Sequence, residues 1–417
     1  MLIKTLLNER YPLKSHIYDS VFKANHHGYD ALIVKIRPRA NGIKKCSNCN
    51  RSGCPGYDRL PERRYQFIPL LGKKTFLEYA PRRVDCRDCG VCVEALPWSD
   101  GKSPLSIPLM LMLSYWARIL SYTGVAKHFD SSYSQVFAAV RYVVSWGLAR
   151  RDLSNISAIG VDEIQVKVGH VYMTLVYQID VHCRRLLWAT SSRKEKAFSK
   201  FFEEFKDILP NIKYVCSDMW KPYLKAIRDK LPNAIHILDR FHIVQNLNKA
   251  MDKVRREEAA RLKSSGYEPH LKGARWALLK RRENLTKKQK GTLRELLKYN
   301  LKSTRAYLLK EHFDQLWGYT YPACAARFID SWTTTVMRSK IEPLKKFAKS
   351  MRKHKPLILN YFICKKSLSS GTVEGLNSVA KLAMRKSFGF RTEKALKVTL
   401  FHQLGKLPEP RLTHKLW

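Results

Sequence analysis

The segment from residue 156 to residue 239 constrains the fold of this chain most strongly. It opens with three apolar runs rich in β-branched and aromatic residues, at 156–162, 170–179 and 184–190. Their short spacing is typical of a meander of antiparallel strands. Helical spacing and short strand patterns then alternate, at 198–205, 212–216, 221–230 and 234–239. Together these patterns predict an α/β layer built on a mixed sheet.

Three acidic residues stand at positions suited to one metal site. Asp162 follows the apolar run Ile-Gly-Val, Asp218 follows Tyr-Val-Cys-Ser, and Glu374 opens a segment with helical spacing. Carboxylates that converge from two strands and a helix can hold hard divalent cations such as Mg²⁺ or Mn²⁺. A pair of such cations activates the attacking oxygen and stabilises the leaving oxygen in phosphodiester chemistry. We therefore predict that Asp162, Asp218 and Glu374 bind metal and act in catalysis.

Simpler interpretations exist for two of these positions. Adjacent residues on a strand point to opposite faces, so only one of Asp162 and Glu163 can face the site. We choose Asp162, because the buried run ends there. Asp218 could merely cap the next helix, although Ser217 could do so equally well.

Four further residues are weaker candidates for the same site. Asp239 ends a strand pattern, and His242 follows three residues later, where it could hydrogen-bond a phosphate or a leaving group. Lys381 and Arg385 continue the helix face that begins at Glu374, which suits the phosphates of a bound DNA strand. A solvated helix face would show the same pattern.

The order of strands and helices is that of a ribonuclease-H-like domain. Residues 241 to about 366 show helical patterns and no comparable strand run. If Glu374 joins the two aspartates, this helical block must leave the catalytic fold and return to it. We therefore predict the first part of the catalytic domain at 153–245, an all-helical insertion at 246–366, and the final helices and C-terminal tail at 367–417.

Six of the ten cysteines lie between positions 46 and 92. Four of them form two CxxC pairs, Cys46 with Cys49 and Cys86 with Cys89. In a reducing compartment this clustering indicates structural Zn²⁺ held by four thiolates rather than disulfides. Cys54 and Cys92 are extra thiols that could replace a ligand, and free buried cysteines are the alternative.

The cysteine pairs would tie together the ends of a small β-ribbon. We predict this zinc-binding module at about 41–98, within an N-terminal region that extends over 1–100. The alternating run Thr-Phe-Leu-Glu-Tyr at 75–79 is expected to form one of its strands.

Three helical patterns follow the cysteine-rich region. An apolar helix ends near Ser121, a short one covers 124–129, and a third covers 133–144. A short helix, a tight turn and a helix opened by serines are typical of a helix-turn-helix, although an ordinary three-helix unit shows the same pattern. We predict a DNA-binding domain at 101–152. The third helix would place four residues nearest the bases, Ser132, Tyr133, Ser134 and Gln135.

The net charge indicates a polyanionic partner. The chain has 77 Lys and Arg against 35 Asp and Glu, a net charge of +42 in 417 residues. A charge this large is most readily explained by DNA phosphates. A ribosomal or merely basic protein is the alternative, but 45% hydrophobic residues and 9 Trp argue against a disordered basic tail.

The sequence gives no sign of a membrane partner. No run approaches the roughly 18 uninterrupted apolar residues that a membrane span requires. The first residues lack the apolar core and the cleavage site of a signal peptide. We therefore expect a cytoplasmic, nucleoid-associated bacterial protein with reduced cysteines.

Several segments together resemble the ISL-three family of bacterial insertion-sequence transposases. They are Gly-Val-Asp-Glu-Ile at 160–164, Cys-Ser-Asp-Met-Trp-Lys-Pro-Tyr at 216–223, Asp-Arg-Phe-His at 239–242, Thr-Val-Glu-Gly-Leu-Asn at 372–377, Lys-Ser-Phe-Gly-Phe-Arg at 386–391 and the two CxxC segments. The resemblance extends from about 45 to 405. It implies a zinc module, a helix-turn-helix and a ribonuclease-H-like domain with a DDE triad on Asp162, Asp218 and Glu374.

We therefore predict a DDE transposase that binds the terminal inverted repeats of its element. It would cleave DNA at the element ends and transfer the 3′-OH ends to target DNA, as a homodimer or larger assembly. A non-catalytic DNA-binding regulator derived from a transposase is the alternative. A recombinase with a covalent Ser or Tyr nucleophile is a third interpretation, against which the three acids and the resemblance both speak.

Overall fold

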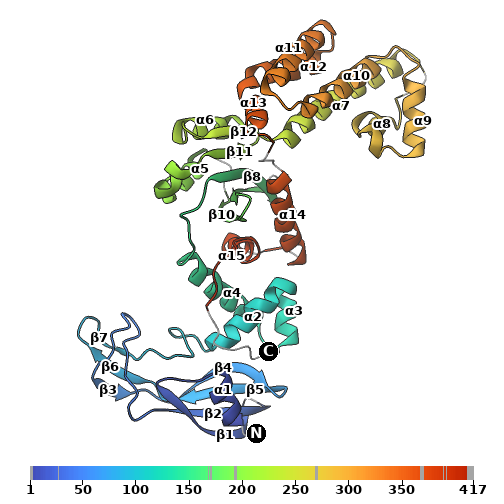
Figure 1. Cartoon of the computed structure of the whole chain (residues 1–417). Coiled ribbons are helices and arrows are strands. Elements are labelled where there is room, and N and C mark those ends of the chain that lie inside the picture. Colours follow the sequence, from blue (N-terminus) through green and yellow to red (C-terminus); the bar gives the residue numbers. More distant parts are fainter. Residues whose placement is uncertain are drawn as a thin grey trace. The chain divides into compact units, whose positions relative to one another are not determined.

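The computed structural model divides the chain into two compact units. Figure 1 labels the helices and strands of both. It describes residues 3–26, 28–167, 169, 171–191, 195–267, 271–366, 371–387, 389–390 and 392–410. The first unit comprises Met1–Arg151 and Leu382–Trp417, and the second comprises Asp152–Lys381.

A four-stranded sheet forms the N-terminal part of the first unit. Its strands lie in the order β1 (His16–His26), β2 (Tyr29–Pro38), β5 (Lys73–Tyr79) and β4 (Arg63–Leu70). All neighbours pair antiparallel except β2 and β5, which are parallel. Helix α1 (Ile3–Arg10) adds Leu7 to a core that includes the fully buried Trp98, whose ring contacts His16 and Tyr79 edge-on.

The cysteine segments belong to a separate, three-stranded antiparallel sheet. It consists of β3 (Gly56–Arg59), β6 (Arg82–Cys86) and β7 (Gly90–Val93). The expectation that the run at 75–79 is part of this ribbon is wrong, because that run is β5 of the larger sheet. Its Phe76 packs with Ala31 and Ile33, while Leu77 enters the main core. A strand that is apolar on both faces suits a central position in a sheet.

Three helices lie where the sequence predicts helices, and they share one core with the four-stranded sheet. They are α2 (Ile107–Ile119), α3 (Tyr122–His128) and α4 (Tyr133–Leu148). Each begins after a serine whose side chain accepts a backbone N–H of the first turn, namely Ser106, Ser121 and Ser132. These serines satisfy N–H groups that have no partner within the helix.

The last helix, α15 (Glu393–Leu404), packs against α4. Two buried hydrogen bonds fix it, one between Ser114 and His402 at 2.9 Å and one between Tyr122 and Thr399 at 2.8 Å. The sequence predicts that residues 367–417 all belong to the catalytic domain. Instead, the contacts place Leu382–Trp417 in the first unit, because the apolar face of α15 is covered there.

The second unit is built on a mixed five-stranded sheet, as the strand patterns predict. Its order is β10 (Arg184–Thr190), β9 (Val171–Ile179), β8 (Ala158–Lys167), β11 (Tyr214–Ser217) and β12 (Ile235–Leu238). The strands β8, β9 and β10 are antiparallel neighbours, and β11 is parallel to both β8 and β12.

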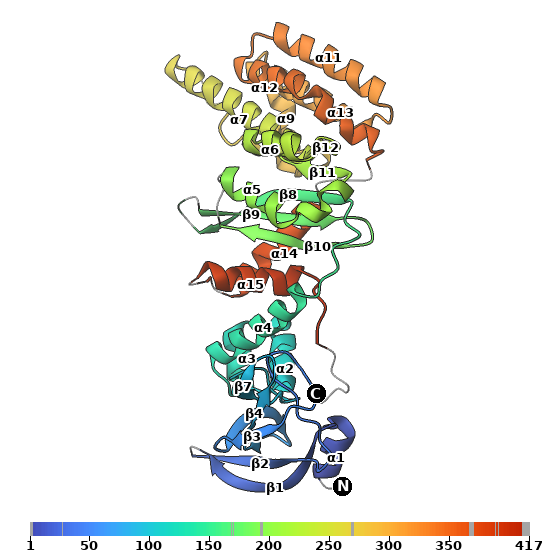
Figure 2. The same cartoon turned by 90° about the vertical axis from the view of Figure 1, so that its left-hand side faces the viewer.

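Helices cover both faces of this sheet (Figure 2). On one face, α5 (Glu195–Glu204) and α6 (Lys221–Lys230) bury Phe201 and Tyr223 against Ile159 of β8. On the opposite face, α14 (Gly371–Lys386) approaches β8 at Gly160. A Cβ at Gly160 would lie only 2.4 Å from Cγ2 of Val373, so this contact requires glycine.

Between β12 and α14, the regular elements among the described residues are all helices, joined by turns. Its α-helices are α7 (Arg240–Ser264), α8 (Arg275–Leu279), α9 (Lys287–Leu296), α10 (Lys302–Asp314), α11 (Pro322–Arg338), α12 (Glu342–Lys353) and α13 (Lys355–Ile363). Phe313, Trp332 and Phe347 contact one another in the core of this block. Helix α13 returns to the sheet, where Asn360 donates to the backbone carbonyl of His236 in β12. None of the described helices has the length and apolarity of a membrane span.

Candidate active site

Three aspartates lie on, or directly after, neighbouring strands of the second unit. Ala158 of β8, Tyr214 of β11 and Ile235 of β12 are aligned in the sheet. Continuing these parallel registers by four residues aligns Asp162, Asp218 and Asp239. The carboxyl ends of parallel strands are where α/β folds place binding residues. The structure thus brings together two of the predicted catalytic acids and the weaker candidate Asp239.

Asp162 is held by groups from its own strand and from α14. Its Oδ1 accepts the backbone N–H of Glu163 at 2.7 Å, and its Oδ2 accepts the side-chain amide of Asn377 at 2.6 Å. Asn377 is buried and in turn accepts the hydroxyl of Tyr177 at 2.8 Å. Glu163 accepts the hydroxyl of Tyr223, on the side of α6. As predicted, Asp162 and Glu163 point to opposite faces of β8.

The other two aspartates precede helices. Asp218 accepts the backbone N–H of Trp220 at 2.9 Å in the turn before α6, but the N-cap of α6 is Trp220 and this helix has no side-chain cap, so the interpretation of Asp218 as a helix cap is wrong. Asp239 is the N-cap of α7 and accepts the N–H of Phe241 at 2.6 Å. His242, in the first turn of α7, has Nε2 3.8 Å from Oδ1 of Asp162 and 3.6 Å from Oδ2 of Asp239.

The three aspartates bring several carboxylates together at a partly buried site. Burial, together with the nearby Asp239 and Asp218, raises the pKa of Asp162 to about 6. The N–H of Glu163 and the ring of His242 act on this pKa in the opposite direction. Carboxylate oxygens are the ligand type that Mg²⁺ and Mn²⁺ prefer. The chemistry of these donors suits a divalent cation, although among the described residues only the four N-terminal cysteines form a group close enough to hold a metal ion.

Glu374 lies in the first turn of α14, on its exposed side. Val373 contacts Gly160, and Asn377, one turn further along the helix, bonds Asp162. Residues three apart on a helix are neighbours on its surface. Glu374 is thus a neighbour of Asn377 along the helix, but its side chain is exposed, whereas Asn377 is buried. Lys381 and Arg385 are exposed further along the same helix.

The residues predicted to read DNA bases have local partners in the first unit. Ser132 and Gln135 form a capping box at the start of α4, and Gln135 also bonds Gln66 at 3.2 Å. Ser134 bonds the hydroxyl of Ser132 at 2.8 Å. Tyr133 is about half exposed and packs near Tyr122. Two of the four residues therefore help to define the helix start.

The predicted zinc ligands converge. One sulfur atom from each of Cys46, Cys49, Cys86 and Cys89 lies within 4.8 Å of the others. Tetrahedral coordination with Zn–S bonds of about 2.3 Å would separate the sulfurs by about 3.8 Å, so the cluster is compatible with Zn²⁺. The Sγ of Cys92 lies 3.3 Å from that of Cys46. Cys54 donates to the carbonyl of Arg51 and also lies beside Cys86.

The two CxxC segments have the same backbone geometry. Backbone N–H groups of Cys49 and Asn48 lower the pKa of Cys46 to about 6, and those of Asp88 and Cys89 lower the pKa of Cys86. The residue after each second cysteine has a positive φ, 61° at Asn50 and 69° at Gly90. These turns direct N–H groups at the first sulfur of each pair and thus favour the thiolate that zinc needs.

Comparison with known protein families identifies the group to which this chain belongs. A family model for ISL3 (ISL-three) transposases of the DDE class, described as "Transposase", matches residues 159–400. This is more than half of the chain. The chain belongs to the ISL3 family of transposases. The match begins in β8 and ends in α15, so it includes the aspartates, the helical block and α14.

Two curated relatives of this ISL3 family member are insertion-sequence transposases. The transposase of IS1001 from Bordetella parapertussis is 27% identical over 367 residues, which are 87% of this chain and 89% of the relative. The transposase of IS1557 from Mycobacterium tuberculosis (strain CDC 1551 / Oshkosh) is 28% identical over 409 residues. The match covers 91% of this chain and 90% of the relative. Both relatives therefore match this chain over most of its length.

The solved structure "Drosophila P element transposase strand transfer complex" is also similar. It shares 9% identity, and the match covers 70% of this ISL3 chain and 90% of that chain, with a TM-score of 0.38. A likeness this distant carries no argument about the site.

The sequence prediction does not include Asn377, which the structure places in the site. A signal was present in the sequence. Val373, Asn377 and Ala380 recur at helical spacing on the buried face of α14. A polar residue on such a face needs a buried partner, and here the partners are Asp162 and Tyr177.

Proposed function

We propose that this ISL3 family member is a DDE transposase whose catalytic residues are Asp162, Asp218 and Glu374. The alignment of Asp162 with Asp218 on parallel strands, with α14 fixed to Asp162 by Asn377, carries the proposal. Two Mg²⁺ or Mn²⁺ ions held by these carboxylates would supply activation of the attacking oxygen and stabilisation of the leaving oxygen. Asp239 and His242 would support the site by orienting Asp162.

The proposed reaction has two steps at each element end. Water first attacks the phosphodiester at the boundary of the element and leaves a 3′-OH. That hydroxyl then attacks a phosphodiester of the target DNA, so the number of phosphodiester bonds is conserved in this second step. The family assignment and the two curated relatives support this activity.

The proposed architecture is a ribonuclease-H-like catalytic domain interrupted by the helical block. The strand order β10-β9-β8-β11-β12, with β11 parallel to both β8 and β12, supports it. We propose that residues 153–245 form the first part of the catalytic domain and that residues 246–366 form the insertion. Helix α14 then returns to the sheet beside Asp162.

DNA recognition is proposed for the first unit. Helices α3 and α4 would act as the helix-turn-helix, with the side chain of Tyr133 about half exposed, and the four-cysteine cluster would hold structural zinc. Lys381 and Arg385 would bind phosphates near the scissile bond. Cleavage of two ends together would require at least a homodimer.

Cleavage assays with a labelled inverted-repeat end test this function. Wild type in Mg²⁺ is expected to nick at the element boundary and leave a 3′-OH. The variants Asp162→Asn and Asp218→Asn are expected to bind the end with unchanged affinity and to cut at least about 100-fold more slowly. Binding without cleavage by wild type in both Mg²⁺ and Mn²⁺ would instead support the DNA-binding regulator.

A further inference from the structure

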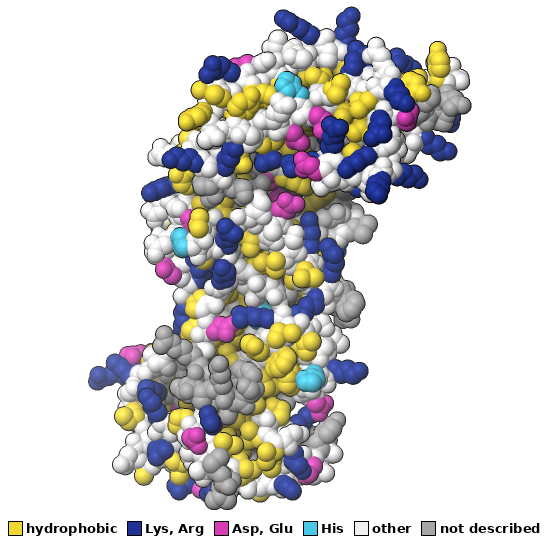
Figure 3. Space-filling model, turned by 45° about the vertical axis from the view of Figure 1, so that its right-hand side comes forward, with side chains coloured by type: hydrophobic (Ala, Val, Ile, Leu, Met, Phe, Trp, Pro, Cys, Tyr) yellow, Lys and Arg dark blue, Asp and Glu magenta, His cyan; other side chains and the backbone are white. Residues whose placement is uncertain are grey.

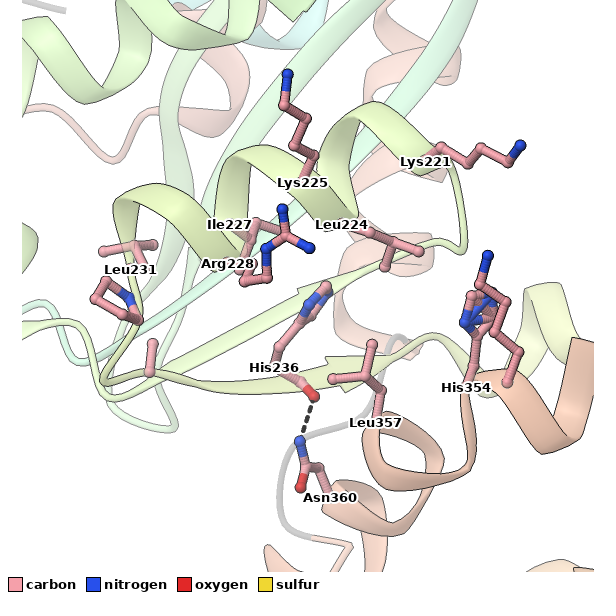
Figure 4. Close-up of a pocket in the computed structure, with 13 residues that line it drawn as sticks. Lys221, Leu224, Lys225, Ile227, Arg228, Leu231, His236, His354, Leu357 and Asn360 are labelled. Carbon is pink, nitrogen blue, oxygen red and sulfur yellow. Dashed lines mark hydrogen bonds between the residues drawn. The ribbon is translucent and has the colours of Figure 1, made fainter.

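A pocket of about 500 Å³ opens in the second unit between α6, β12 and α13 (Figure 4). Its floor is apolar. Leu224 and Ile227 of α6 face Leu357 of α13 across it. The volume lies within the range of about 300–1,000 Å³ that is usual for small-molecule sites. The pocket is not formed by the carboxylate cluster described above.

Basic side chains surround this apolar floor. Lys221, Lys225 and Arg228 come from α6, and Lys353 comes from the end of α12. Figure 4 shows the guanidinium of Arg228 beside the ring of His236. Arg228 also bonds the carboxylate of Asp229 at 3.0 Å, but this pair is exposed and neutralises little charge. None of the described residues that line the pocket is acidic.

His236 adds a polar group without adding charge. Burial, with a smaller contribution from the neighbouring His354, lowers its pKa to about 4, so the ring is neutral near pH 7. Its Nε2 bonds the hydroxyl of Ser217 at 2.8 Å, and its backbone carbonyl accepts the amide of Asn360. The ring is thereby fixed in place on β12, at one side of the pocket.

An apolar floor within a ring of cations suits a ligand with a flat, weakly polar part and an anionic part. A nucleotide has both, because its base can pack against aliphatic side chains while its phosphate contacts Lys and Arg. Simple tracking of a DNA backbone needs the cations but has no use for the apolar floor. A purely apolar ligand would leave the cations without a role.

We propose that this pocket binds a single nucleotide, with the base on Leu224 and Leu357 and the phosphate among Lys221, Arg228 and Lys353. This inference rests on the proposed function: the bound nucleotide would be an unpaired nucleotide of the bound DNA rather than a free nucleotide. Enzymes that do chemistry on a base hold the nucleotide outside the base stack in a snug pocket, at the expense of unstacking it.

The test compares two duplexes of one sequence, one fully paired and one with a single unpaired adenine. The full-length protein is titrated in Ca²⁺, and the ratio of the two Kd values is measured. Wild type is expected to prefer the unpaired duplex roughly tenfold. Arg228→Glu and Leu357→Gln are expected to bring the ratio close to one. Lys346→Glu, an equal charge change at an exposed site of α12 outside the pocket, should weaken both duplexes equally and keep the ratio.

A second arm distinguishes the source of the nucleotide. A fluorescent dATP is titrated into wild type and Leu357→Gln, and thermal melting confirms that each variant is folded. If this probe binds only to wild type while the duplexes bind equally, the pocket is a site for free nucleotides and the DNA source is wrong. If neither the probe nor the unpaired duplex depends on Leu357 or Arg228, the proposal is overturned. Both readouts are independent of cleavage, so a failure of the proposed function would be seen separately.

Discussion

At the scale of single residues, Asp162 shows how the candidate site is held. Its carboxylate accepts one N–H from its own strand and one amide from α14, and it lies near His242. Asn377 also accepts the hydroxyl of Tyr177, so this hydroxyl fixes the amide that in turn holds Asp162. A carboxylate fixed in this way can present its free lone pairs to a cation without reorganisation.

Substituting Asn377 tests this arrangement. We expect Asn377→Ala to slow DNA cleavage by about 10- to 100-fold, because Asp162 would lose the amide that orients it. Raising the Mn²⁺ concentration should restore part of the rate, which a merely structural defect would not allow. The rate is measured in single-turnover cleavage over a range of metal concentrations.

The control for this prediction is Asn284→Ala, since Asn284 is exposed and outside the site. The control should cleave like wild type. An unchanged rate for Asn377→Ala, or an equal loss in the control, would contradict the positioning role.

Sequence patterns locate the acids but not their partners. Asp162 and Asp218 are recognisable because each follows an apolar strand pattern and the order of elements aligns them. Asn377 and Tyr177 are 200 residues apart in the chain, and their hydrogen bond depends on the docking of α14. A pattern that is read along the chain does not contain such a contact.

At the scale of elements, the contact between α14 and β8 decides whether Glu374 can reach the aspartates. Gly160 provides the space for Val373, and Ile179 lies on the other side, with its Cγ2 3.2 Å from a Cβ at Gly160. Packing this tight does not accommodate another methyl group without displacing the helix.

We expect Gly160→Ala to lower the free energy of unfolding by about 1–3 kcal/mol. It should also reduce cleavage, because α14 would be displaced. The double variant Gly160→Ala/Val373→Ala should recover much of the lost stability and of the lost cleavage rate. Denaturant titration measures the free energy of unfolding, and single-turnover nicking measures cleavage.

The matched control is Gly291→Ala in α9, where a Cβ meets nothing within 4 Å. Alanine there should be neutral or stabilising by up to about 1 kcal/mol. If Gly160→Ala is no more destabilising than Gly291→Ala, the close approach of α14 to β8 is wrong.

The three-stranded sheet depends on the four-cysteine cluster rather than on a large core, since only a few apolar side chains pack with the cysteines. We expect one Zn²⁺ per chain by elemental analysis. Cys86→Ser should lose the metal and DNA-end affinity, because a four-thiolate site loses a ligand. Cys54→Ser should retain the zinc.

A zinc content that falls equally in Cys54→Ser would contradict this ligand set. Cys92→Ser is informative as well, because Cys92 lies 3.3 Å from Cys46. A loss of zinc in that variant would show that Cys92 is a ligand.

Elements are predictable from the sequence where the pattern is local. The strands β8 to β12 and the helices α2 to α6 follow from periodicity and, for α2 to α4, from their serine caps. The sequence does not show which sheet contains β5, because β5 pairs in parallel with β2, about 40 residues earlier in the chain. The place of α15 depends likewise on contacts with α2 and α3 that only the folded chain brings together.

At the scale of the whole molecule, the charge is the dominant property. Lys and Arg side chains are spread over the face shown in Figure 3, and acidic side chains are fewer there. A net charge of +42 favours association with DNA of any sequence. Specific recognition of element ends must therefore compete with strong non-specific binding.

We expect the affinity for an inverted-repeat end to fall steeply with salt. Each phosphate contact contributes about 0.9 to the slope of log K against log salt concentration, so several contacts give a slope of several units. The double variant Lys381→Ala/Arg385→Ala should lower the slope by about 2. Anisotropy titrations between 50 and 300 mM salt, roughly the range in which such slopes are measured, provide the check. A flat dependence would contradict binding along the phosphate backbone.

The central claim is that a helix far along the chain completes the site begun by Asp162 and Asp218. The most direct measurement is single-turnover nicking of a labelled inverted-repeat end in Mg²⁺ by wild type, Glu374→Gln and the control Glu342→Gln. Glu342 is an exposed glutamate of α12 that pairs with Lys345. We predict that Glu374→Gln binds the end but does not cut, while Glu342→Gln cuts like wild type. Cleavage by Glu374→Gln at the wild-type rate would show that the third acid lies elsewhere in the chain.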